Sequence, residues 1–203
     1  MEHPKKTYYP NYHVMKHKDE WDEHTRRVIE SRAQTKDSTF FTAEERELLA
    51  DLVHHLFPSH LGEKSIDVVS LFDEHCAKGY LRGYRKGCRH TKLTIIHLGL
   101  KSIQSHSLEA YFQPFLSLKK AEQQHLIEEW MNNKGLKNIW QNVAPYTFMQ
   151  TLMDELISIV YSDPSVWSAI GYGGPAYPHG YYAFGPKQFD KWEAPVHDKP
   201  SSR

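Results

Sequence analysis

The sequence predicts an all-α fold, an irregular bundle of about six to eight helices that ends in an extended Gly/Pro/aromatic segment. Apolar residues recur every three or four positions over most of the chain, and no stretch alternates in the manner of a β-strand. The 203 residues are enough for a single core. We expect an N-terminal arm at 1–18, a helical domain at 19–170 and an extended segment at 171–203.

The front of the chain predicts two helices. The arm shows no periodicity, and residues 19–35 form a strongly charged pattern that is typical of a first helix. The clearest helix follows Thr42, a good N-cap residue, with Glu45 placed to complete a capping box. Pro58 ends it, because proline lacks the N–H that a helix interior needs.

The remainder of the domain predicts further helices. Apolar periodicity indicates them at 65–82, around 93–103, at 119–132 and at 145–161, and the last is apolar enough to be the central helix. The stretch "LEAYFQPFLSL" is apolar but interrupted by Pro114. We therefore expect a separate short helix and a turn there.

Composition limits the classes of partner. Lys+Arg and Asp+Glu both number 25, so the whole chain has no net field to attract nucleic acid or an acidic membrane. Residues 75–108 hold seven basic and no acidic side chains. This segment predicts a contact for an acidic partner around Arg82, Arg85 and Arg89, or else a solvated surface balanced by the acidic first helix. It lacks a nucleic-acid-binding motif.

The sequence predicts a cytoplasmic protein, with membrane association left open only through a partner. No apolar run approaches the length of a transmembrane segment, and no secretion signal is visible at the N-terminus. The two cysteines, Cys76 and Cys88, are too few for a disulfide framework, and whether they pair is open.

No catalytic, cofactor-binding or metal-binding set is predicted. The pairs Glu122/His125 and Asp51/His54 have the spacing of metal ligands on one helix face, but they lie in polar runs and are expected to be surface side chains. His13 and His17 are expected to be incidental. Phosphate-binding, dinucleotide-binding and serine-hydrolase motifs are missing from the sequence.

The end of the chain has an unusual composition. Asp163 is a plausible N-cap, Pro164 fits the first turn, and Gly171 can end a short helix around Trp167. Residues 171–186 then hold five glycines, three prolines and five aromatic rings but no charged residue. So much ring area must be covered, either by the chain's own helices or by another subunit. The predicted contacts with a partner are Trp167, Gly171, Tyr172, Gly173, Gly174, Tyr177, Tyr181 and Tyr182.

Two stretches carry a family resemblance. The sequence "FFTAEERELLADLVHHLFP" near the front and "YSDPSVWSAIGYGGPAYPHGY" near the back resemble the gluconate 2-dehydrogenase subunit 3 family. The resemblance covers roughly residues 40–185, and the back motif is the more specific half. It implies a small, cofactor-free helical subunit that associates with a large FAD-bearing oxidoreductase of the glucose–methanol–choline (GMC) type.

The resemblance therefore implies a non-catalytic accessory subunit. The large subunit would hold the FAD and oxidise a sugar, a sugar acid or a polyol, and a cytochrome c subunit would often accept the electrons. The sequence leaves open the substrate, the electron acceptor, the stoichiometry and the stability of the lone subunit. Two alternatives come from the residues alone: a stand-alone helical interaction module that uses the basic 75–108 segment, and a metal-binding helical-bundle enzyme.

Overall fold

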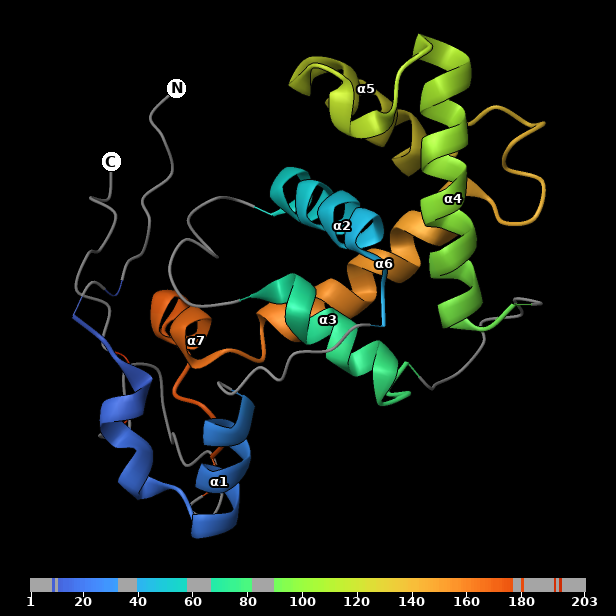
Figure 1. Ribbon diagram of the computed structural model, residues 1–203. Coiled ribbons are helices and arrows are strands. Elements are labelled where there is room, and N and C mark those ends of the chain that lie inside the picture. Colours follow the sequence, from blue (N-terminus) through green and yellow to red (C-terminus); the bar gives the residue numbers. More distant parts are fainter. Residues whose placement is uncertain are drawn as a thin grey trace, which may run out of the picture. The chain divides into compact units, whose positions relative to one another are not determined.

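The structure is a computed structural model, and it describes residues 9, 11–32, 40–57, 67–81, 90–176, 180, 192 and 194. These residues form helices joined by turns, and they contain no β-strand, so the predicted all-α class is confirmed (Figure 1). None of the described helices is long and apolar enough to cross a membrane. The chain divides into two compact units, which are described separately.

The first unit comprises Met1–Thr35, Ser59–Ile66 and Ile159–Arg203. It contains the 3-10 helix η1 (Val14–Glu20), the helix α1 (Glu23–Arg32) and the helix α7 (Pro164–Ile170). Asp22 begins α1, because its carboxylate accepts the backbone N–H groups of His24 and Thr25. The first helix thus begins at Glu23, later than the predicted residue 19, and Glu20 belongs to η1. Residues 33–35 of the predicted range lie outside the described residues.

The second unit comprises Lys36–Pro58 and Asp67–Ser158. Its helices, in chain order, are α2 (Ala43–Leu56), α3 (Val68–Ala77), α4 (Lys92–Tyr111), η3 (Phe115–Ser117), α5 (Lys120–Met131) and α6 (Pro145–Val160), whose last two residues lie in the first unit. Phe148, Met149, Leu152 and Leu156 of α6 are fully buried, as the predicted central helix requires. Gly99 of α4 leaves the space that the Phe148 ring occupies.

Helix α4 corrects one prediction. The residues 108–111 were expected to lie in a separate short helix, but they form the last turn of α4. Leu108, Glu109 and Ala110 are good helix formers, and Pro114 lies beyond the helix end, where it interrupts no helical hydrogen bond.

Cys76 is a free thiol that is buried in α3. Burial, with the nearby carboxylates of Asp73 and Glu155, raises the pKa of its thiol to about 12. The thiolate is therefore disfavoured, and Cys76 acts as a small apolar side chain. Cys88 lies outside the described residues.

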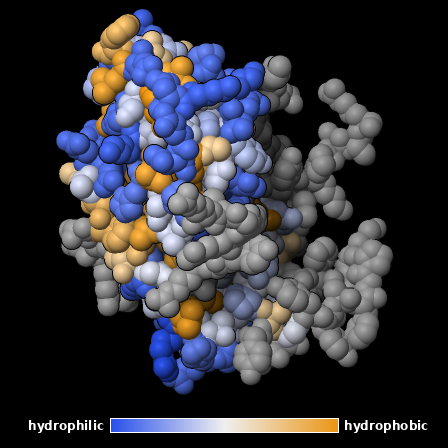
Figure 2. Space-filling model, turned by 90° about the vertical axis from the view of Figure 1, so that its right-hand side faces the viewer, coloured by the Kyte–Doolittle hydropathy of each residue, from blue (hydrophilic) through white to orange (hydrophobic). Residues whose placement is uncertain are grey.

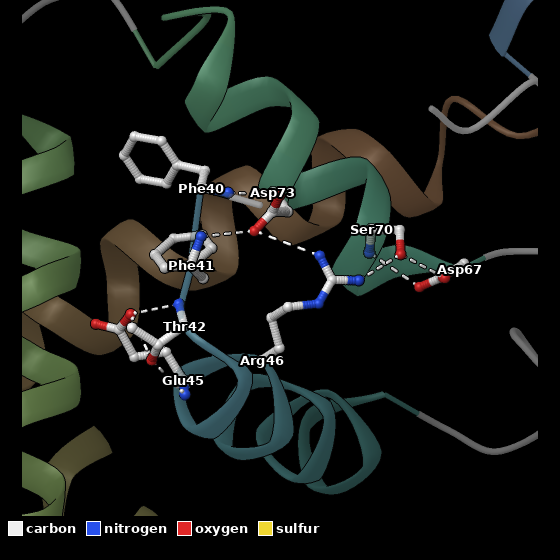
Figure 3. A network of polar contacts seen from close by, with 8 residues as sticks. All are labelled: Phe40, Phe41, Thr42, Glu45, Arg46, Asp67, Ser70 and Asp73. Carbon is white, nitrogen blue, oxygen red and sulfur yellow. Dashed lines mark hydrogen bonds and ion pairs between the residues drawn. The ribbon is translucent and has the colours of Figure 1, made fainter. Parts of the chain in front are cut away.

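The entry into α2 is fixed by its capping residues and by a buried carboxylate (Figure 3). The predicted capping box is confirmed: Thr42 Oγ1 accepts the N–H of Glu45 at 3.2 Å, and Glu45 Oε2 accepts the N–H of Thr42 at 2.9 Å. Asp73 of α3 is fully buried and accepts the backbone N–H groups of Phe41 at 2.8 Å and Phe40 at 3.1 Å.

Arg46 completes this network from α2. Its guanidinium lies 3.4 Å from Asp73 Oδ1 and donates to Ser70 Oγ at 2.8 Å (Figure 3). The network thus joins α2 to α3 and satisfies a carboxylate that has no access to water.

A second buried polar group lies among aromatic rings. His106 of α4 is buried, and its Nδ1 accepts the indole N–H of Trp130 at 2.8 Å and that of Trp140 at 3.2 Å. Only an imidazole whose Nδ1 carries no proton can accept these bonds. Burial lowers the pKa of His106 from its ordinary 6.5, although the carboxylates of Glu129 and Glu109 oppose that shift.

We predict that Asp73→Ala destabilises the protein by about 3 kcal/mol, because two backbone N–H groups and Arg46 lose their acceptor. The matched control is Asp67→Ala, which removes the exposed N-cap of α3 and the acceptor of the Ser70 hydroxyl but leaves Asp73 in place, and should cost about 1 kcal/mol. Chemical denaturation measures both values. Equal losses for the two variants would contradict the assigned role of Asp73.

We also predict a pH dependence that His106 causes. Its folded-state pKa is depressed, so it stabilises the fold above pH 6.5, and this contribution is lost as the pH falls through the folded value. The unfolding free energy of the wild type should therefore fall more steeply below pH 6.5 than that of His106→Gln, which keeps an acceptor that does not titrate. Parallel slopes for His106→Gln and wild type would contradict this role.

Candidate partner-binding surface

The most specific stretch of the sequence forms α7 and the turn after it. Asp163 Oδ1 accepts the N–H of Ser165 at 2.7 Å, and Pro164 occupies the first turn, where no N–H is needed. Gly171 ends the helix in the left-handed conformation, with φ at 76°. The predicted N-cap, first-turn proline and C-cap are therefore all confirmed.

Trp167 lies at the centre of this stretch and is buried. Its indole N–H donates to the carbonyl oxygen of Tyr161 at 2.6 Å. The ring of Tyr172 meets the Trp167 ring edge-on, with centroids 5.4 Å apart. Trp167 therefore packs within its own unit and holds the residues before and after α7 together.

The N-terminal arm covers another side of α7. Tyr12, Val14, Trp21, Ile29, Trp167 and Ala194 form one buried cluster. The N–H of Val14 donates to Ser168 Oγ at 3.1 Å, and the Tyr12 hydroxyl donates to the carbonyl oxygen of Trp192 at 2.6 Å. The N-terminal arm, whose sequence has no apolar periodicity, is thus an ordered part of this unit from Tyr12 onward.

Two glycines make these contacts possible. A Cβ on Gly171 would lie 2.4 Å from the nearest ring atom of Tyr9, and a Cβ on Gly174 would lie 2.6 Å from the Trp21 ring. Gly174 is buried and also has a left-handed φ, 82°. Any side chain at these two positions would both strain the backbone and push the arm away.

Three large apolar side chains around Trp167 remain exposed. Tyr161 lies just before α7, Ile170 is its last residue, and Tyr172 follows Gly171, each between 38% and 45% exposed. We call Tyr161, Ile170 and Tyr172 the α7 surface. The sequence pointed to Tyr172 but not to Tyr161 or Ile170, although both flank Trp167 in the quoted motif.

The remaining predicted contact residues divide into two groups. Gly173 lies beside Trp192: a Cβ on Gly173 would lie 3.4 Å from the Trp192 ring, an ordinary contact distance. Tyr177, Tyr181, Tyr182, Arg82, Arg85 and Arg89 lie outside the described residues.

The histidine pairs do not assemble a metal centre in the part of the chain that the structure describes. No group of three or more His, Cys, Asp or Glu side chains there is placed to hold a metal ion. Glu122 Oε2 instead accepts the N–H of Lys119 at the start of α5, 2.9 Å away. His54 Nε2 lies 3.3 Å from Lys120 Nζ.

We predict that Gly174→Ala destabilises the protein by about 2 kcal/mol or more, because it adds a ring clash to the strain of a left-handed alanine. Gly180→Ala is the matched control: its φ is 74°, and a Cβ there would meet nothing within 4 Å. The control should carry only the strain of the backbone, about 1 kcal/mol. Thermal unfolding of both variants tests this, and equal losses would contradict the contact with Trp21.

Comparison with known proteins identifies one family. The model of one family, gluconate 2-dehydrogenase subunit 3, matches residues 43–174, from the first residue of α2 to the glycine that contacts Trp21. No curated protein and no solved structure matches the chain. Because the match spans the greater part of the sequence, this chain belongs to the gluconate 2-dehydrogenase subunit 3 family.

Proposed function

We propose that this chain is a non-catalytic accessory subunit that binds and stabilises a FAD-dependent oxidoreductase of the GMC type. Membership of its family indicates an accessory subunit of a dehydrogenase complex, and this observation carries the proposal. The partner would hold the FAD and oxidise a sugar, a sugar acid or a polyol. Electrons would leave through the partner and, where one is present, a cytochrome c subunit.

The α7 surface supports a binding role. Two tyrosines and an isoleucine are exposed together around a buried tryptophan, and aromatic residues are enriched in protein interfaces. The indole hydrogen bond of Trp167 and the N-terminal arm hold this stretch in place. A surface that is ordered before binding loses little conformational entropy when it meets a partner.

Binding of this kind would stabilise the partner by mass action. A subunit that binds only the folded flavoprotein shifts its folding equilibrium toward the native state. The chain needs no catalytic group of its own for that effect. We assign the contact to the α7 surface and keep the predicted residues Tyr177, Tyr181, Tyr182, Arg82, Arg85 and Arg89 as further candidates.

Co-expression with a GMC-type flavoprotein encoded in the same genome tests the proposal. We expect the two chains to co-elute in size-exclusion chromatography with flavin absorbance, and the flavoprotein to melt at a higher temperature in the complex. Tyr172→Ser should weaken the complex about tenfold. Tyr146→Ser, at another exposed tyrosine in the second unit, should leave the affinity unchanged.

Two results would contradict the proposal. In the first, the wild-type chain fails to co-elute with the flavoprotein, which is equally stable and active alone. In the second, the isolated chain oxidises a sugar, a sugar acid or a polyol without any partner.

A further inference from the structure

The end of α4 exposes a large aromatic ring. Phe112 is 88% exposed, and Leu108, one turn before it, is 49% exposed. Tyr111, between them, is partly exposed. We call Leu108, Tyr111 and Phe112 the α4 tip. Figure 2 shows hydrophobic (orange) side chains at the top of the face, the end where α4 finishes in Figure 1.

The backbone at Phe112 is unusual for its residue type. Its φ and ψ are 56° and 24°, and its N–H donates to the carbonyl oxygen of Leu108 to end the helix. Glycine ordinarily occupies this left-handed position, because a Cβ there crowds the next carbonyl group. Neither burial nor backbone preference explains a phenylalanine here, and such strain is concentrated at functional sites.

The residues next to the tip hold it in a fixed position. Ser107 is fully buried, and its hydroxyl donates to the carbonyl oxygen of Gln113 at 2.7 Å. Gln104 Oε1 accepts the N–H of Phe115, whose ring is fully buried. Residues before and after Phe112 are thus bonded to the rest of the chain and buried in the core. They hold the turn, and with it the exposed Phe112 ring, in a fixed position.

The segment that carries the tip holds a single charged residue. Glu109 is the only Asp, Glu, Lys or Arg between Lys101 and Lys119, and Asn138 Nδ2 donates to its carboxylate at 2.9 Å. An anionic membrane surface attracts clusters of basic residues, and the tip has none. Its complement is an uncharged, apolar surface on another protein.

We propose that the α4 tip is a second binding site for the flavoprotein subunit, with the Phe112 ring inserted into an apolar, uncharged pocket of that subunit. The inference rests on the proposed function, and it adds a contact in the unit that does not contain the α7 surface. A ring that is exposed in the free chain becomes the anchor of the complex. Because few charges take part, the contact depends little on salt.

Phe112→Gly separates this role from a structural one. Glycine removes the ring and also relieves the left-handed strain, so the isolated chain should melt at the wild-type temperature or above it. The complex with the flavoprotein should nevertheless weaken about tenfold or more, at low and at high salt. Tyr146→Ser, which removes an exposed ring in the first turn of α6, should change neither quantity.

The outcomes distinguish the two proposals. If the wild-type chain forms no complex, the proposed function fails and this inference fails with it. If the wild type binds and Phe112→Gly binds equally well, only this inference is overturned. A lower melting temperature for the glycine variant would show that the ring packs within the chain, and would overturn it. Binding of wild type but not Phe112→Gly to phosphatidylglycerol vesicles, with unchanged affinity for the flavoprotein, would assign the tip to a membrane instead.

Discussion

The contacts between two aromatic rings near the N-terminus and two glycines around the end of α7 are the constraint on which the first unit depends. Tyr9 lies against Gly171, and Trp21 lies against Gly174. Neither approach leaves room for a Cβ, and both glycines use a backbone conformation that other residues avoid. The same contacts order the arm, close the cluster around Trp167 and fix the direction in which the chain leaves α7.

These contacts limit the surface that is left for a partner. The uncharged, ring-rich segment needed a cover, and two of its glycines, Gly171 and Gly174, lie against Tyr9 and Trp21 of the same chain. Among the described residues, the α7 surface in one unit and the α4 tip in the other remain for a partner. Both consist of exposed apolar side chains whose neighbours are buried, which suits an accessory subunit that is ordered before it binds. We assign the catalytic oxidation to the flavoprotein.

The features that the sequence could predict are local. Thr42 with Glu45, and Asp163 with Pro164, act within one helical turn, and Gly171 acts on the turn that it ends, so the local sequence identified these helix ends. The contacts of Asp73 with Phe40 and Phe41, and of Trp21 with Gly174, join residues far apart in the sequence and leave no periodic signal. For the same reason the burial of Trp167 was left open between core and interface. The prediction of a separate helix from residue 108 was wrong, because α4 continues to Tyr111 and Pro114 lies beyond its end.

The α7 turn rests on Trp21 of the same chain before any partner binds. Nuclear Overhauser effects in the isolated protein report proton pairs in close contact and so measure this packing. We expect cross-peaks between the α protons of Gly174 and the indole protons of Trp21. Assigned resonances for both residues with no cross-peak between them would contradict it.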